Sequence, residues 1–119
     1  MRDAWAELET YLRGFMDTLE ERPRAVLVVS GPWEEAVPTV NSGAHPSLLY
    51  DYAGFPEHTY QLAFPAPGAP DLAARVDALL SAAGIGSGTE PRRGWDHGVF
   101  VPLKVMLPNA DLSVVQLSL

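Results

Sequence analysis

A short run of aliphatic residues constrains the fold of this chain more than any other feature. The run occupies positions 25–29 within the segment 24–30, and its apolar residues do not alternate with polar ones. Such a strand is typical of a mostly parallel sheet that is covered on both faces. Gly31 and Pro32 then end the strand. Because ligands of these sheets bind outside the carboxyl ends of the strands, we expect the residues that follow to lie near a functional site.

Two segments have the periodicity of amphipathic helices. Residues 3–21 place their apolar side chains mostly three and four positions apart, on one helical face: Trp5, Leu8, Leu12, Phe15, Met16 and Leu19. Pro23 should end this helix, because a residue before proline disfavours the helical conformation. Residues 70–83 predict a second helix, with Pro70 in its first turn and Gly84 just after its end. A shorter helix or turn is expected within 95–108.

The remaining segments complete a layered arrangement. Residues 37–41 predict a short strand near a sheet edge, because Pro38 cannot donate a ladder hydrogen bond. Residues 112–119 predict a final apolar strand, covered either by the rest of the domain or by a partner chain. The 119 residues therefore suggest one domain, 1–119, of the α/β class: a layered, mostly parallel sheet flanked by helices. The irregular stretch 42–70 is long enough to favour a functional role.

Charge and composition exclude several classes of protein. The formal net charge of −7 argues against binding to nucleic-acid phosphates or to an anionic membrane surface. The sequence has no cysteine, which excludes disulfides, thiolate metal sites and cysteine nucleophiles. No apolar run is long enough to span a bilayer, and no targeting segment is recognisable. We therefore expect a cytoplasmic protein.

Histidine is the most informative candidate for chemistry. His45 and His58 are interpreted as loop or surface residues, and Glu34 and Glu35 as a solvated pair at the end of a strand. His97 lies between Asp96 and a glycine, and an imidazole is the natural general acid/base near neutral pH. The neighbouring Asp96 could orient that imidazole. The alternative is a structural histidine that holds the turn.

Several blocks of the chain together resemble the class III extradiol ring-cleavage dioxygenases, of the DOPA 4,5-dioxygenase type. The most specific blocks are Tyr-Asp-x-x-Gly-Phe-Pro at 50–56 and Asp-His-Gly-x-x-x-Pro-Leu at 96–103. Matching blocks also occur at 23–34, 60–62, 64–68 and 114–119. The resemblance covers nearly the whole chain but only about the N-terminal half of a family member.

The resemblance implies a central sheet flanked by helices and cleavage of catechol rings beside their hydroxyl groups. The family uses a non-haem Fe(II), or in some relatives Zn(II), held by histidines or by two histidines and a carboxylate. A further histidine, in the Asp-His-Gly block, acts as acid/base. His97 matches that position.

The departures from the family pattern concern the metal ligands. The family block after the first buried strand reads Ser-Ala/Gly-His-Trp, and its histidine is a ligand. Here the block reads Ser30-Gly31-Pro32-Trp33, and proline has no donor atom in its side chain. The other two ligands would come from a block before the first helix and from a half that follows position 119. We therefore expect no metal cofactor for this chain alone.

Three interpretations remain open at this point. The chain is a truncated relative without dioxygenase activity, a subunit or fragment completed by another chain, or a module that binds a catechol-type small molecule or mediates oligomerisation. Half of a doubly covered sheet would expose apolar residues and a strand edge, so we expect a homo-oligomer or a chain that supplies the missing half. Four aromatic residues form either such a ligand pocket or simple packing: Tyr50, Tyr52, Phe55 and Tyr60.

Overall fold

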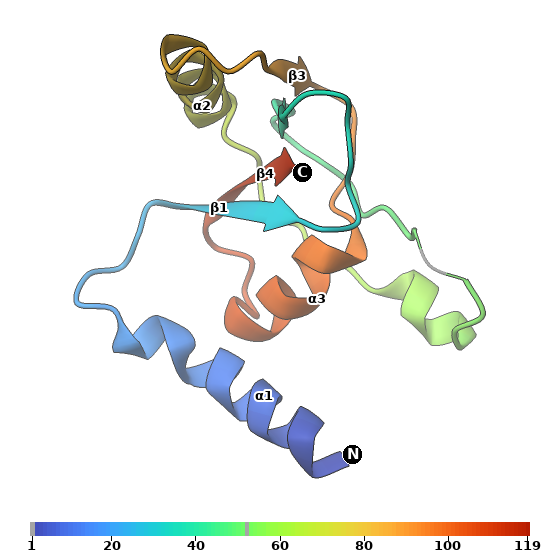
Figure 1. Cartoon of the computed structure of the whole chain (residues 1–119). Helices are drawn as coiled ribbons and strands as arrows, with labels where there is room; N and C mark the ends of the chain where they lie inside the picture. The colour runs from blue at the N-terminus through green and yellow to red at the C-terminus, as the bar shows by residue number, and fades with distance from the viewer. Residues whose placement is uncertain (1, 52) are drawn as a thin grey trace.

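A four-stranded sheet organises the chain and confirms the predicted α/β class (Figure 1). The computed structural model describes residues 2–51 and 53–119. The strands lie in the order β1-β4-β2-β3, with bounds β1 Ala25–Ser30, β2 Thr39–Asn41, β3 Gly88–Glu90 and β4 Ser113–Ser118. The β1–β4 and β2–β3 pairs are parallel, and β2 pairs with β4 in the antiparallel direction.

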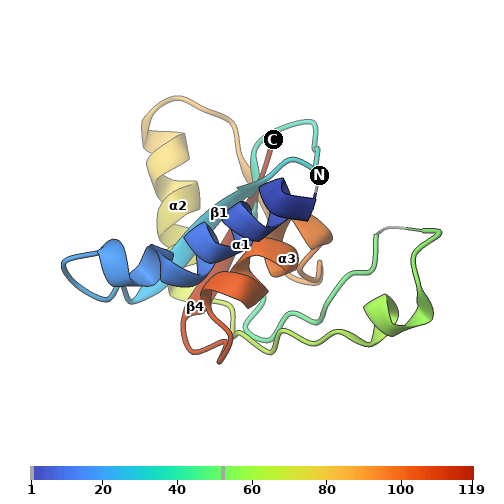
Figure 2. The same cartoon turned by 90° about the horizontal axis from the view of Figure 1, so that it is seen from below.

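Helices cover the two faces of the sheet unequally. Helix α3 (His97–Met106) packs below β1, and α1 (Arg2–Phe15) packs on the outer side of α3 (Figures 1 and 2). On the other face, α2 (Pro70–Ala82) contacts β2 and β3. Two 3-10 segments, Met16–Thr18 and Glu57–Gln61, extend α1 and interrupt the irregular stretch before α2. The predicted helices therefore form, although α1 ends earlier than the apolar periodicity suggested.

The core is divided between the two faces in the same way. The larger cluster lies between α3 and the sheet and is built on fully buried side chains, among them Trp95, Val99, Phe100 and Val114. The smaller cluster, of Val40, Ala73 and Val115, lies under α2. Strand β4 contributes to both clusters, so other parts of the same chain cover the final strand on both faces.

The prediction that both faces of β1 are covered is wrong for this chain. Val26 and Val28 pack against the larger cluster, whereas Leu27 and Val29 are 48% and 55% exposed. The physical reason is the position of α2, which lies over β2 and β3 instead of over β1. Since β1 pairs only with β4, it is also an edge strand.

The strand predicted within residues 37–41, near a sheet edge, forms only at Thr39–Asn41 and lies one strand in from the edge. Strand β2 pairs with β3 on one side and β4 on the other, and all three of its residues are buried. Pro38 precedes the strand, so its missing N–H disturbs no ladder, and its carbonyl accepts a hydrogen bond from the Gly88 N–H at 3.0 Å. The short strand β3, which fills the edge beyond β2, had no hydrophobic pattern that could have predicted it.

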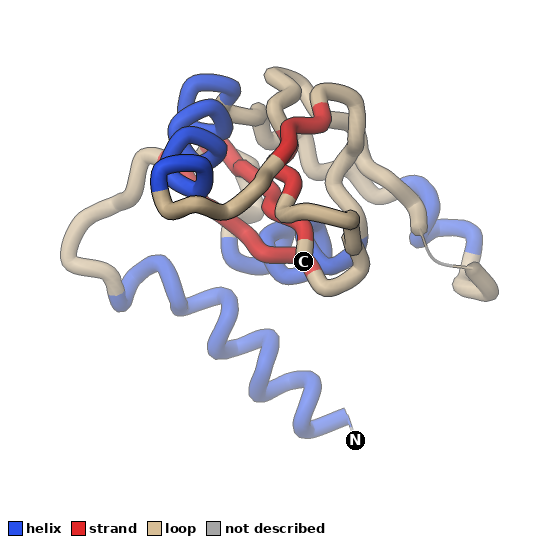
Figure 3. The backbone as a smooth tube through the Cα atoms, turned by 45° about the horizontal axis from the view of Figure 1, so that its top comes forward, coloured by secondary structure: helices blue, strands red, loops and turns tan. Residues whose placement is uncertain are grey.

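The irregular stretch between β2 and α2 runs far from the sheet and carries the 3-10 segment near its outer end (Figures 2 and 3). Before it runs outward, the stretch contacts the body of the molecule at Leu48, which forms an isolated parallel bridge with Trp95. No helix among the described residues is long and apolar enough to cross a membrane.

Candidate functional site

The first turn of α3 approaches the end of β1 because residue 98 is glycine. A Cβ atom added at Gly98 would lie 2.9 Å from Pro32 Cδ and 2.9 Å from Ser30 Oγ, which is too close for any side chain. The glycine therefore permits a contact that brings His97, the first residue of α3, near the 30–32 segment. This is the sheet end at which the sequence predicted a functional site.

The His97 ring is paired with the carboxylate of Asp51, from the irregular stretch. Nδ1 of the ring lies 2.9 Å from both Oδ1 and Oδ2 of Asp51, and the His97 backbone N–H donates to Oδ1 at 3.1 Å. The His97 side chain is 46% exposed and that of Asp51 is 19% exposed. The two specific sequence blocks thus meet in this side-chain pair, although its two residues lie 46 positions apart.

The electrostatics of Asp51 reflect this pairing. Partial burial by itself would raise the pKa of Asp51, but the hydrogen bonds from the His97 ring and backbone N–H outweigh it. The pKa of Asp51 is therefore held below its ordinary value, and its carboxyl group is ionised at neutral pH.

Asp96 does not orient His97, which corrects the hypothesis drawn from their adjacency. The Asp96 side chain is fully buried and turned away from the helix, where it accepts hydrogen bonds from three side chains. Ser30 Oγ donates at 2.7 Å, Arg93 Nη2 donates at 3.0 Å, and Gln116 Nε2 donates to the same oxygen as Arg93. Asp96 therefore joins β1, β4 and the start of α3 into one buried polar network.

Trp95 holds the irregular stretch in place beside α3. Its backbone N–H donates to the Ser47 carbonyl at 2.8 Å, and its carbonyl accepts from the Leu49 N–H at 2.7 Å. Gly94 allows this approach, because a Cβ there would lie 2.3 Å from the Ser47 oxygen. Asp51 follows two residues after Leu49, whose carbonyl accepts the Asp51 N–H at 3.0 Å.

Of the four aromatic residues for which a ligand pocket and simple packing were both considered, Tyr50 and Tyr60 contact each other. The Tyr50 ring lies edge-on to Tyr60 at 6.0 Å and to Phe100 at 6.3 Å, and its hydroxyl donates to the Leu62 carbonyl at 2.6 Å. Phe55 is 57% exposed. Tyr52 lies outside the described residues.

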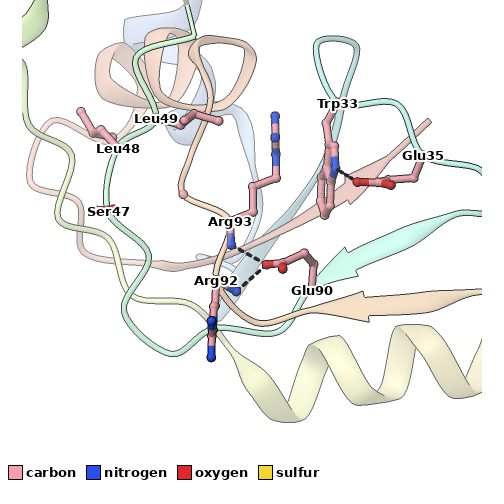
Figure 4. Close-up of a pocket in the computed structure, with 9 residues that line it drawn as sticks. Trp33, Glu35, Ser47, Leu48, Leu49, Glu90, Arg92 and Arg93 are labelled. Carbon is pink, nitrogen blue, oxygen red and sulfur yellow. Dashed lines mark hydrogen bonds between the residues drawn. The ribbon is translucent and has the colours of Figure 1, made fainter.

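A cavity of about 460 Å³ lies next to this site, beside Trp33 and Arg93 (Figure 4). The Arg93 guanidinium sits 4.9 Å from the centre of the Trp33 ring, and the indole N–H donates to Glu35 Oε1 at 2.8 Å. Glu90 accepts hydrogen bonds from the backbone N–H groups of Arg92 and Arg93. Sequence reasoning missed Arg93 and Glu90, because nothing in their local pattern distinguishes them from solvated charges.

The described residues do not fit a metal centre. No three of their histidine, aspartate and glutamate side chains are grouped so that they could hold a metal ion. Pro32 contacts the α3 turn but supplies no donor atom. His45 is exposed, and the side chain of His58 lies outside what the structure describes. Of the two histidines whose side chains the structure describes, His97 is the one at the start of α3, beside the end of β1.

Comparison with known proteins defines the class to which this fold and site belong. The family model described as the catalytic LigB subunit of aromatic ring-opening dioxygenase matches residues 7–119. A crystal structure of an uncharacterized protein from Escherichia coli K12 superposes with a TM-score of 0.70 at 34% identity, over 93% of this chain and 39% of that one. The chain therefore belongs to the LigB family of class III extradiol dioxygenases, whose members are typically metal-dependent.

Relatives within the family are considerably longer than this chain. A 4,5-DOPA dioxygenase extradiol from Portulaca grandiflora is 46% identical over 98 residues, which are 82% of this chain and 36% of that protein. The protein of the same name from Escherichia coli strain K12 is 39% identical over 98 residues, again 82% of this chain and 36% of the relative. The chain thus spans between 31% and 42% of the length of such curated relatives.

Proposed function

We propose that this chain carries the acid/base part of an extradiol dioxygenase site and does not cleave aromatic rings by itself. Family membership and the position of His97 support the acid/base part. The observation that carries the second part is Pro32, which stands at the end of β1 where the family's sequence pattern has a ligand histidine. A non-haem iron site needs about three protein ligands, and His97 alone cannot supply them.

The chemistry assigned to His97 is proton transfer with a catechol-type substrate. A catechol must lose a hydroxyl proton to become an electron-rich catecholate, and an imidazole within hydrogen-bond reach can accept that proton. The same group can return the proton when the ring-opened product forms. His97 is suited to this role because half of its side chain remains exposed while Asp51 holds one side of the ring.

The uncovered part of β1 favours a second candidate, in which another chain completes the site. Leu27 and Val29 form an apolar surface on β1, whose outer edge has no partner strand among the described residues, and such edges pair with other chains unless they are protected. The matched region covers only 31% and 42% of two of the family members that this chain resembles, so more than half of each lies outside it. A homo-oligomer, or a polypeptide that supplies the remaining part of the fold and its metal ligands, would cover this surface.

Metal reconstitution and oxygen uptake test the main proposal. The purified chain is loaded with Fe(II) or Zn(II), and bound metal is measured together with oxygen consumption on catechol. The same measurements are made on Pro32→His and on Pro108→His, a matched substitution at an exposed position. We expect no stoichiometric tight metal binding and no oxygen uptake in any of the three proteins. Stoichiometric iron and turnover in the unmodified chain would overturn the proposal.

Complementation tests the second candidate. The chain and its Pro32→His variant are co-expressed with the part of the Portulaca grandiflora relative that lies outside the matched region. Completion by another chain predicts co-purification of the two polypeptides and catechol-dependent oxygen uptake that appears only with Pro32→His. If the two polypeptides do not associate, while the chain remains a folded monomer at high concentration, this candidate is wrong.

A further inference from the structure

We infer that Asp51 is the positioning residue of the site and holds His97 in the tautomer that carries its proton on Nδ1. In that tautomer Nε2 bears the lone pair and is the nitrogen that accepts a proton. The inference rests on the proposed acid/base role of His97, but it concerns which ring nitrogen performs that role, and it can be tested without any turnover.

The contact geometry selects the tautomer. Both carboxylate oxygens of Asp51 lie 2.9 Å from Nδ1. An ionised carboxylate has no hydrogen to donate, so it can only accept, and Nδ1 must therefore be the donor. A neutral imidazole has a single N–H, which leaves the lone pair on Nε2. A carboxylate partner that fixes tautomer and ring orientation in this way is a recurrent device for histidines that act as bases.

A second contact keeps the carboxylate in this position. Oδ1 of Asp51 also accepts the backbone N–H of His97, which is the first residue of α3. The first N–H groups of a helix lack acceptors within the helix, and the positive end of the helix dipole favours an anion there. The N-cap residue Asp96 makes no capping hydrogen bond, because its side chain points into the buried network. Asp51 therefore supplies the cap from a distant part of the chain.

Backbone hydrogen bonds connect the segment that carries Asp51 to the residues just before His97. The Asp51 N–H donates to the Leu49 carbonyl, and the Leu49 N–H donates to the carbonyl of fully buried Trp95. Trp95 lies two residues before His97. The positions of Asp51 and His97 are therefore both fixed relative to the same buried tryptophan. The lowered pKa of Asp51 is consistent with this arrangement, because it keeps the carboxylate ionised and accepting.

Substitution of Asp51 by asparagine makes a directional prediction. The amide carbonyl can take over the cap by accepting the His97 N–H, as Oδ1 does now. The amide NH₂ group then faces Nδ1, and because it can only donate, it favours an unprotonated Nδ1. Asp51→Asn should therefore move the proton from Nδ1 to Nε2 with little change in shape.

Nuclear magnetic resonance of the histidine side chains tests the inference. The ¹⁵N shifts of Nδ1 and Nε2 distinguish a protonated from an unprotonated nitrogen, and His97→Gln assigns the signals. Spectra are recorded, at a pH where the ring is neutral, for the unmodified chain, for Asp51→Asn and for Asp71→Asn, an exposed aspartate in the first turn of α2. We expect Nδ1–H in the unmodified chain and in Asp71→Asn, and predominantly Nε2–H in Asp51→Asn.

The outcomes separate this inference from the proposed function. An Nε2–H tautomer in the unmodified chain would overturn the inference, even if Asp51→Asn failed to fold. An Nδ1–H tautomer that persists in a folded Asp51→Asn protein would overturn it as well. The tautomer is measured in the metal-free chain. Whether or not the oxygen-uptake experiments detect turnover, the tautomer result is therefore unchanged.

Discussion

The two faces of the sheet differ in how completely this chain covers them. On the face toward α3, aromatic and aliphatic side chains form a continuous core, and the polar network of Asp96 closes its end. On the opposite face, α2 covers β2 and β3, and the outward residues of β1 stay exposed. The candidate site therefore lies on the face of the sheet that this chain covers. The opposite face is left partly uncovered at β1.

This difference separates residues that stabilise the chain from residues available to a partner. A side chain that is fully buried in this chain contributes to folding directly, whereas one that is half exposed contributes little until something covers it. The family's longer members have additional sequence that could supply such a cover. Mutations placed on each face test this difference.

The largest effect is expected at the centre of the covered face. Trp95→Ala removes a fully buried indole from the main core and should destabilise the chain by about 3–5 kcal/mol. Trp5→Ala, at a tryptophan that is 67% exposed, should change stability by less than about 0.5 kcal/mol. Urea denaturation followed by circular dichroism measures both. Equal losses in the two variants would contradict the assignment of Trp95 to the core that stabilises the chain.

Loss of the buried carboxylate at the end of the same core should be nearly as severe. Asp96→Ala leaves the Arg93 guanidinium, the Ser30 hydroxyl and the Gln116 amide without their acceptor, at a cost of about 3 kcal/mol. Asp111→Ala is the matched control, because its ion pair with Arg22 is half exposed and should contribute less than about 1 kcal/mol. The free energies of unfolding of the two variants are compared at neutral pH. A loss below about 1 kcal/mol in Asp96→Ala would show that the network does not close the core.

A smaller, pH-dependent effect is expected for Asp51. Because the folded-state pKa of Asp51 is lowered, its contribution is fully present above the unfolded value, near 3.8, and is lost as the pH falls through the folded-state value. Asp51→Asn should therefore cost about 1 kcal/mol at neutral pH and progressively less as the pH drops below 3.8. Unfolding free energies measured across the acid range check this, with Asp71→Asn as control. A difference between the unmodified chain and Asp51→Asn that grows on acidification would contradict the assigned pairing.

The smallest effect on stability is expected on the open face. Leu27→Lys and Val29→Lys place charges on exposed positions of β1 and should change the free energy of unfolding by less than about 0.5 kcal/mol. They should nevertheless reduce any self-association, because charges on an edge strand oppose pairing. Light scattering at increasing concentration measures the association. The control is Val28→Lys, on the packed side of the same strand, which should instead unfold the chain. A stability loss above about 2 kcal/mol in Leu27→Lys would show that this face is already covered.

The sequence predicted the elements whose patterns are local. The helix at Pro70–Ala82 follows from its apolar spacing and its terminal proline and glycine, and Gly84 indeed has a φ of 79°. The strands β1 and β4 follow from their aliphatic runs, and the α/β class follows from the order of the elements. His97 could be singled out because its block is specific, and its catalytic role remains a prediction.

Contacts between distant segments could not be read in this way. Adjacency suggested Asp96 as the partner of His97, but successive residues at a helix start point in different directions, and Asp96 is drawn inward by three donors. The actual partner, Asp51, lies in an irregular segment whose path depends on backbone bonds to Trp95. The position of β2 inside the sheet likewise depends on β3, which has no hydrophobic signature.

The amino-acid sequence by itself determined the family, the helices and strands with strong periodicity, and the lack of a donor side chain at Pro32. Only the tertiary structure decided which carboxylate meets His97, which face of β1 stays open and which polar groups are buried together. The physical reason is range: periodicity and caps act within a few residues. Hydrogen bonds such as that between Asp51 and His97 form only after the whole chain has brought their segments together.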